Sequence, residues 1–296
     1  MINVVPSGDI LGARIEGLDL FKPVSAEDHR AVVQALGENG MICVPDQHIS
    51  AGQLKAFAQR FGTLEINVAN SFMDDDHPEV MILSNIKKDG KPIGLSDAGQ
   101  DWHTDMSYSK DIAFANVLYG LEIPTRDGAP LGCTEFANMH RAYDDLPDEL
   151  KTKLAGRTAT HDFNKFWEKM RSEKGSSRPP LTPEQRAKKP PVSQPIFLTH
   201  PITGGTVLYA NPGYTMQIDG MDKQESDEIL AFLFKHQLQE KYRFKHMWKK
   251  FDVIMWDNIG TLHNAVADYG PDEHRLIKRC QVMADKVLDG AALQLA

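Results

Sequence analysis

The order of apolar segments along the chain constrains the fold more than any other feature of the sequence. Two amphipathic helical patterns come first, and the apolar segments after residue 80 are mostly short, as strands are. Ser25 followed by Asp28 is typical of a helix N-terminal cap, and Ser50 marks a second helix start. We therefore expect an α+β protein in which helices flank an antiparallel sandwich or barrel.

The same periodicity assigns the individual elements. Predicted helices follow Ser25 and Ser50, the second of them ending at Gly62, and two more cover residues 139–154 and a stretch that begins near Lys223. The predicted strands cover residues 13–18, 41–44, 80–83, 112–121, 134–136, 196–198, 207–210, 252–256 and 277–283.

Residues 171–195 differ from the rest of the chain. They are dense in proline, serine and charge, and such a segment buries too little apolar surface to offset the entropy of ordering. We expect a long mobile loop, which is either a lid over a site or plain disorder. No internal repeat or hinge-like linker divides the chain, so residues 1–296 are expected to form a single domain that carries this lid-like loop.

Charge and composition limit the classes of partner. The formal charge is −8, with 33 basic against 41 acidic residues, which argues against a nucleic-acid binder but leaves an anionic small substrate open. No run approaches the roughly 18 apolar residues of a membrane span. The N-terminus lacks the features of a signal peptide, and Cys43, Cys133 and Cys280 form no disulfide framework. A cytoplasmic location is the expectation.

Two distant segments carry candidate metal ligands. In Asp101-Trp102-His103-Thr104-Asp105, an extended backbone would point His103 and Asp105 to the same face. The predicted strand 252–256 ends at Asp257, and His263 follows shortly after it. Two histidines and one carboxylate are the facial ligand set of non-haem Fe(II) oxygenases, whereas zinc more often takes a closed shell or three protein ligands and water.

Arg275 and Arg279 form a third candidate cluster. At this spacing on a strand both side chains would point inward, where their planar guanidinium groups suit a carboxylate or another anion. The alternative is a pair of surface arginines in ordinary salt bridges.

Together these motifs resemble the Fe(II)- and 2-oxoglutarate-dependent dioxygenases of the taurine dioxygenase and 2,4-dichlorophenoxyacetate dioxygenase family. The resemblance extends over nearly the whole chain, in the order and approximate spacing of the family. The matching segments are Gly12-Ala13, Gly17-Leu18-Asp19-Leu20, Pro45-Asp46-Gln47, Trp102-His103-Thr104-Asp105, Gly132 to Met139, Trp256-Asp257-Asn258 and His263 through Arg279.

The resemblance implies a double-stranded β-helix (a cupin-like jelly roll) flanked by helices. It implies that His103, Asp105 and His263 hold Fe(II), and that Arg275 and Thr134 bind the distal carboxylate of 2-oxoglutarate. It further implies a reaction with O2 that hydroxylates a small organic acid and releases succinate and CO2. Relatives are commonly oligomers, so a homodimer or homotetramer is expected.

Substrate contacts implied by the resemblance differ from those of the taurine enzyme. Arg279 matches the arginine that contacts the sulfonate there, but Asn67 stands in the region of a contacting histidine, and Gly99 replaces an asparagine. Phe163 and Tyr214 match aromatic pocket positions, with core packing as the alternative. Taurine is therefore not expected, and the candidates are another sulfonate, an aryloxyalkanoate, another carboxylate or a phosphonate.

Two other functions stay open on the sequence alone. One is a zinc-dependent hydrolase or isomerase of the cupin type, and the other is a non-catalytic protein that binds a small acid. His140, His161 and His200 lack a partner at metal-ligand spacing and are expected to be structural or surface histidines.

Overall fold

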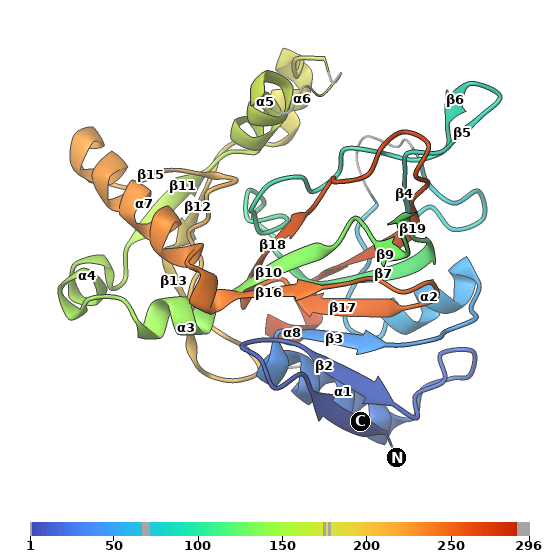
Figure 1. Cartoon of the computed structure of the whole chain (residues 1–296). Helices are drawn as coiled ribbons and strands as arrows, with labels where there is room; N and C mark the ends of the chain where they lie inside the picture. The colour runs from blue at the N-terminus through green and yellow to red at the C-terminus, as the bar shows by residue number, and fades with distance from the viewer. Residues whose placement is uncertain (1, 67–71, 174–175, 177–178, 289–296) are drawn as a thin grey trace.

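The computed structural model describes residues 2–66, 72–173, 176 and 179–288 (Figure 1). Its helices are α1 Ala26–Asn39, α2 Ala51–Ala58, α3 Met139–Asp144, α4 Asp148–Leu154, α5 Phe163–Glu173, α6 Pro183–Lys188, α7 Lys223–Gln237 and α8 Asp285–Leu288, with a 3-10 turn at Glu240–Tyr242. Its longer strands are β1 Asn3–Pro6, β2 Ala13–Glu16, β3 Met41–Val44, β4 Met81–Ser84, β7 Ala113–Glu122, β10 Thr134–Asn138, β11 Thr158–His161, β12 Val192–Pro195, β15 Thr215–Ile218, β16 Arg243–His246, β17 Val253–Asp257, β18 Thr261–Ala265 and β19 Leu276–Met283. Shorter strands are β5 Lys87–Lys88, β6 Lys91–Pro92, β8 Thr125–Arg126, β9 Ala129–Pro130, β13 Phe197–Thr199 and β14 Thr206–Leu208.

A seven-stranded sheet with the order β1-β2-β3-β17-β7-β19-β4 is the main structural layer. All its pairings are antiparallel except that of β2 with β3. The interior strand β7 is buried on both faces: Val117 and Tyr119 contribute to the apolar cluster beneath the helices, and Leu118 contributes to the cluster on the opposite face. Burial on both faces explains why this strand is continuously apolar in sequence.

A three-stranded sheet, β16-β10-β18, lies against that opposite face. Phe136 of β10 packs edge-on against Trp256 of β17, with ring centroids 5.5 Å apart, and both belong to the same apolar cluster as Leu118. The two sheets are thus held together by a shared core, in agreement with the expected mixture of helices and mainly antiparallel strands.

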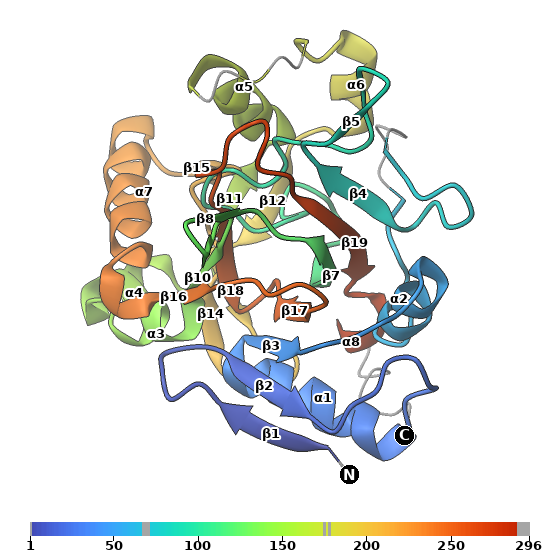
Figure 2. The same ribbon diagram turned by 45° about the vertical axis from the view of Figure 1, so that its right-hand side comes forward.

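Helices α1 and α2 cover the large sheet, with Val33, Leu36 and Leu54 in its core (Figures 1 and 2). The Ser25 and Ser50 side chains cap them as predicted, since each hydroxyl accepts from a backbone N–H three residues later. In both views α5 and α6 lie above the sheets and α7 lies to one side. Among the described helices none has the length and apolar character that crossing a membrane requires.

Two helix boundaries differ from the sequence prediction. Helix α2 ends at Ala58, before Gly62, and the single helix expected over residues 139–154 is two helices, α3 and α4. Pro147 causes this break, because proline restricts the residue before it to extended conformations and has no N–H to continue the α3 ladder. Pro147 instead precedes the first residue of α4.

The expectation of a long mobile loop at residues 171–195 is wrong for the described residues, because they include helical and strand segments. The segment contains the end of α5, the short helix α6 and the strand β12, which pairs with β11. Thr182 and Gln185 form a capping box at the start of α6. Capping and strand pairing satisfy the backbone here, so order does not depend on a large apolar face. Residues 174–175 and 177–178 lie outside the described residues.

A buried ion pair lies between the end of β17 and the β13–β14 hairpin. His200 Nε2 is 2.8 Å from Asp257 Oδ2, and both side chains are inaccessible to solvent. Burial lowers the pKa of His200, but the charge and hydrogen bonding of Asp257 outweigh burial, so the pKa of His200 is raised above its ordinary value.

This ion pair predicts a pH-dependent stability. The pKa of His200 is higher in the folded state than the value of about 6.5 in the unfolded state, so protonation of His200 stabilises the fold. This stabilisation is fully present below about pH 6.5 and is lost as pH rises through the folded-state pKa. His200→Gln is expected to lower the free energy of unfolding by about 3 kcal/mol at pH 6 and by less at pH 9. Urea unfolding across this range measures the difference, with His48→Gln, an exposed histidine, as control. An equal loss at both pH values would contradict the charged state of the pair.

Candidate functional site

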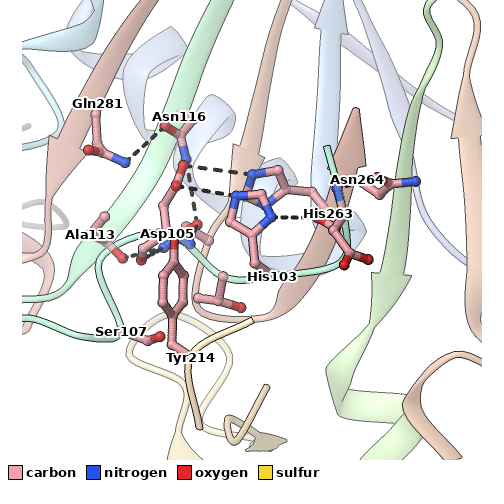
Figure 3. A network of polar contacts seen from close by, with 12 residues as sticks. His103, Asp105, Ser107, Ala113, Asn116, Tyr214, His263, Asn264 and Gln281 are labelled. Carbon is pink, nitrogen blue, oxygen red and sulfur yellow. Dashed lines mark hydrogen bonds and ion pairs between the residues drawn. The ribbon is translucent and has the colours of Figure 1, made fainter. Parts of the chain in front are cut away.

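Two histidines from distant parts of the chain are joined by a pair of backbone hydrogen bonds. His103 N donates to His263 O at 3.1 Å, and His263 N donates to His103 O at 3.0 Å, which makes an antiparallel bridge between the 101–105 segment and β18. Gly213 lies against this bridge, where an added Cβ would be 2.6 Å from His103 Cβ. Both imidazoles and the Asp105 carboxylate consequently point to the same place (Figure 3).

The three side chains form a cluster with metal-ligand spacing. Asp105 Oδ1 is 3.4 Å from His103 Nε2, and Asp105 Oδ2 is 3.7 Å from His263 Nε2. One ligand atom of each residue lies within 4.8 Å of the others, and all three residues are buried. Adjacent ligands of a six-coordinate ion with bonds of about 2.1 Å are roughly 3 Å apart, so the cluster suits a divalent transition metal.

The protonation states of the cluster also suit a metal. Burial would raise the pKa of Asp105, but its contact with the His103 ring and the charge of Arg279 hold that pKa well below its ordinary value. Burial, reinforced by His103, lowers the pKa of His263 and keeps it neutral. His103 Nδ1 lies 2.7 Å from Asp101 O, and donation to this carbonyl leaves the Nε2 lone pair free to bind a metal.

Asn258 fixes the position of the Asp105 backbone. Its Oδ1 accepts from Asp105 N at 3.1 Å, and its Nδ2 donates to Asp105 O at 2.8 Å. Asn116 and Gln281 extend this polar chain into the large sheet. The Trp256-Asp257-Asn258 motif therefore has two uses: Asp257 belongs to the buried ion pair, and Asn258 holds the backbone of the 101–105 segment.

Removal of the Asn258 amide is expected to loosen this site. Asn258→Ala deletes both hydrogen bonds to Asp105, and the loss of such a supporting contact typically weakens metal affinity or activity 10- to 100-fold. Equilibrium dialysis with Fe(II) or Mn(II) measures the affinity, with Gln224→Ala on the exposed face of α7 as control. An unchanged metal affinity in folded Asn258→Ala would contradict this positioning role.

The two arginines have different surroundings. Arg279 lies on β19, and its Nη1 is 3.5 Å from Asp105 Oδ2, so it borders the metal cluster directly. Arg275 precedes β19 and is 7% exposed, with its Nε near Gly132 and its guanidinium 5.9 Å from the Tyr269 ring centroid. Both side chains point inward, as predicted, and neither is a surface arginine.

Arg275 carries a buried charge beside the segment that contains Thr134. No carboxylate oxygen among the described residues lies within 4 Å of it, and burial lowers the pKa of its guanidinium. Thr134 Oγ1 accepts from Trp248 Nε1 at 3.0 Å, which orients the hydroxyl. A buried cation with an oriented hydroxyl nearby is suited to an anionic group of a bound ligand.

Aromatic side chains cover the other side of the cluster. Tyr214 lies 6.1 Å from His103 between ring centroids, and Phe163 packs on Tyr108 at 4.8 Å. Phe166 is closer to His103, at 4.9 Å, and also contacts Tyr214. Phe163 and Tyr214 were expected from the sequence, whereas Phe166 and Tyr108 were not. The spacing of Phe163, Phe166 and Met170 places them on one face of α5, which is a signal for Phe166 but does not distinguish a site from a core, and no such pattern marks Tyr108.

The other residues considered in the sequence analysis are Asn67 and three histidines outside the cluster. Asn67 lies outside the described residues. His161 is fully buried between Ser107 and Thr215, and burial lowers its pKa to about 3. Among the described residues, no group with metal-ligand spacing includes His140, His161 or His200. The contacts of His161 with Ser107 and Thr215, and of His200 with Asp257, confirm that these two histidines are structural.

Comparisons with known proteins agree with this geometry. The model of the family described as "Taurine catabolism dioxygenase TauD, TfdA family" matches residues 3–281. Pentalenolactone F synthase of Streptomyces avermitilis is 30% identical, over 94% of this chain and 92% of its own. The alpha-ketoglutarate-dependent 2,4-dichlorophenoxyacetate dioxygenase of Cupriavidus pinatubonensis is 28% identical, over 96% and 98%.

Solved structures show the same similarity. A putative alpha-ketoglutarate-dependent 2,4-D dioxygenase from Burkholderia xenovorans superposes with a TM-score of 0.78 at 28% identity, over 97% of this chain and 98% of its own. AAD-2 in complex with Mn(II) and N-oxalylglycine gives 0.79 at 28% identity, over 96% and 97%. The chain therefore belongs to the TauD/TfdA family and is an oxidoreductase that depends on Fe(II), 2-oxoglutarate and O2.

Proposed function

We propose that His103, Asp105 and His263 hold the Fe(II) and that the enzyme hydroxylates a small anionic organic substrate, with release of succinate and CO2. The observation that carries this proposal is the convergence of the three ligand atoms within 4.8 Å in a buried cluster. Three protein ligands on one face leave positions for 2-oxoglutarate and O2. When bound, the iron supplies the oxidising chemistry, and the protein supplies binding and orientation.

Arg275 and Thr134 bind the distal carboxylate of 2-oxoglutarate in this proposal. The support is the buried guanidinium of Arg275, which has no carboxylate partner among the described residues, and the hydroxyl held by Trp248. A bound carboxylate would compensate that buried charge and form a bidentate pair with the guanidinium.

In this proposal Arg279 binds the anionic group of the prime substrate, and the aromatic side chains contact its apolar part. Arg279 stands beside the metal cluster, and Tyr108, Phe163 and Tyr214 present apolar surface next to it. The names of relatives include 2,4-dichlorophenoxyacetate dioxygenase, a putative sulfonate dioxygenase and an alkylsulfatase. We infer a carboxylate, sulfonate, sulfate ester or phosphonate attached to an apolar or aromatic group.

The α5–α6 region acts as a lid in this proposal. Lys189 lies over the Tyr108 ring at 5.9 Å, and Gln194 Nε2 donates to Ser109 O at 2.7 Å, so the residue after α6 and the strand β12 contact the turn that follows the 101–105 segment. We also infer that the two facing sheets form the jelly roll of this family within one domain, and that the enzyme is a cytoplasmic homodimer or homotetramer.

Anaerobic titration of the protein with Fe(II) and 2-oxoglutarate tests the proposal before any substrate is known. A visible metal-to-ligand charge-transfer band is expected, and it is expected to disappear in His263→Ala. Succinate release with a panel of anionic compounds then identifies the substrate class. Folded, metal-loaded protein without the band would overturn the proposal and favour a zinc hydrolase or a small-acid binding protein.

A further inference from the structure

A second group of metal-ligand side chains lies outside the site described above. Cys43 is on β3 of the large sheet, His246 ends β16 of the small sheet, and Asp252 directly precedes β17. One ligand atom from each lies within 4.8 Å of the other two. We propose that this Cys43 cluster binds a thiophilic divalent cation, Zn²⁺ being the ion that such donors suit best, as a second metal site that shares no residue with the iron ligands.

The donor atoms of the Cys43 cluster are largely buried and incompletely hydrogen-bonded. His246 Nε2 lies 3.5 Å from Asp252 Oδ2 and makes no hydrogen bond, although the two side chains are only 11% and 5% exposed. Asp252 Oδ2 accepts from Lys249 N at 2.9 Å, which aims the carboxylate toward the cluster. An unsatisfied buried imidazole nitrogen is costly, and a cation placed among the three donors would satisfy it.

The chemistry of the donor set favours zinc over iron or magnesium. Thiolate, imidazole and carboxylate are all zinc ligands, and three protein ligands with an open fourth position make a common zinc arrangement. Burial and the Asp252 carboxylate raise the pKa of the Cys43 thiol, and the charges of Arg14 and Lys249 offset this only in part. The thiol is therefore protonated without metal, and the Zn²⁺–thiolate bond forms as the S–H bond breaks and its proton leaves to solvent.

The location of the cluster gives the cation a structural effect. Thr134 of β10 is the register partner of His246, and Trp248 packs edge-on against the His246 ring at 5.2 Å between centroids. A bound cation would link the edge strand β16 to β3 of the opposite sheet. It would also hold the His246 ring in place. That ring contacts Trp248, and Trp248 in turn orients the Thr134 hydroxyl.

Cobalt titration distinguishes this cluster from the iron ligands, because His103, Asp105 and His263 include no sulfur. Co²⁺ added to the whole protein is expected to give a near-ultraviolet thiolate-to-cobalt absorption, which Zn²⁺ then abolishes. Cys43→Ser is expected to remove the absorption, and His246→Gln to weaken Co²⁺ binding more than tenfold. Cys133→Ser and Cys280→Ser are the matched controls and are expected to retain it.

Absence of the absorption in folded wild-type protein at saturating Co²⁺, or its persistence in Cys43→Ser, would overturn the proposal. Alkylation covers the case in which Cys43→Ser does not fold. Zn²⁺ is expected to slow iodoacetamide modification of the partly exposed Cys43 more than tenfold, as followed by peptide mass spectrometry. An unchanged rate would equally overturn the proposal. Neither result depends on the visible band that tests the iron site.

Discussion

Asp105→Ala is expected to abolish 2-oxoglutarate turnover while leaving the protein folded. The substitution removes the only carboxylate of the proposed ligand set and leaves two imidazoles beside the cationic Arg279. Loss of a residue that only supports a metal ligand typically lowers metal affinity or activity 10- to 100-fold. Loss of a ligand itself is therefore expected to lower the rate of succinate release by more than about 100-fold. Succinate release under saturating Fe(II) measures the effect.

The control for Asp105→Ala is Asp227→Ala, which removes an exposed carboxylate from α7. Its activity is expected to match that of the wild type. Full activity of Asp105→Ala, with iron content unchanged, would refute the assignment of the triad. Anaerobic titration of the same variant shows whether binding of iron and 2-oxoglutarate, rather than a later step, is what fails.

Arg275→Met is expected to raise the KM for 2-oxoglutarate by about 30-fold or more. This factor corresponds to the roughly 2 kcal/mol or more that is lost when one partner of a buried charge pair is truncated. The variant's free energy of unfolding without ligand is expected to be equal to or above that of the wild type, because the substitution removes a buried charge that forms no ion pair with a described carboxylate. Steady-state kinetics and urea unfolding supply the two measurements.

Arg279→Met is the matched comparison for Arg275→Met. Arg279 borders the metal cluster, whereas Arg275 lies beside Gly132, so Arg279→Met is expected to weaken the prime substrate more than 2-oxoglutarate. Equal effects of the two variants on both ligands would contradict this division between the arginines.

Local sequence patterns predicted much of the architecture. The helix caps at Ser25 and Ser50 and the strands around Met41 and Ile277 could be read because each depends on neighbouring residues. The break at Pro147 was missed because the apolar helical pattern continues across it. Helix α6 and strand β12 were missed because they depend on capping and on pairing with β11, which composition does not reveal.

The candidate site was also predictable only where a local sequence pattern marks its residues. His103, Asp105 and His263 carry a recognisable ligand pattern, and the structure brings their side chains together. The role of Asn258 was not predictable, because its contacts to Asp105 join residues 153 apart in sequence. Phe166 was missed because an aromatic residue on an amphipathic helix gives the same signal whether it packs in a core or beside a site.

The strand order has a consequence for how the enzyme acquires its metal. The last strand, β19, is not at an edge but lies between β7 and β4, and His263 meets His103 only after β18 has formed. Pairings between residues so distant in sequence form late and slowly. A ribosome-bound chain that has not yet released residues 261–283 therefore has neither a complete large sheet nor the complete set of proposed ligands. Iron is expected to enter after translation, into a nearly finished fold, rather than to nucleate folding of the nascent chain.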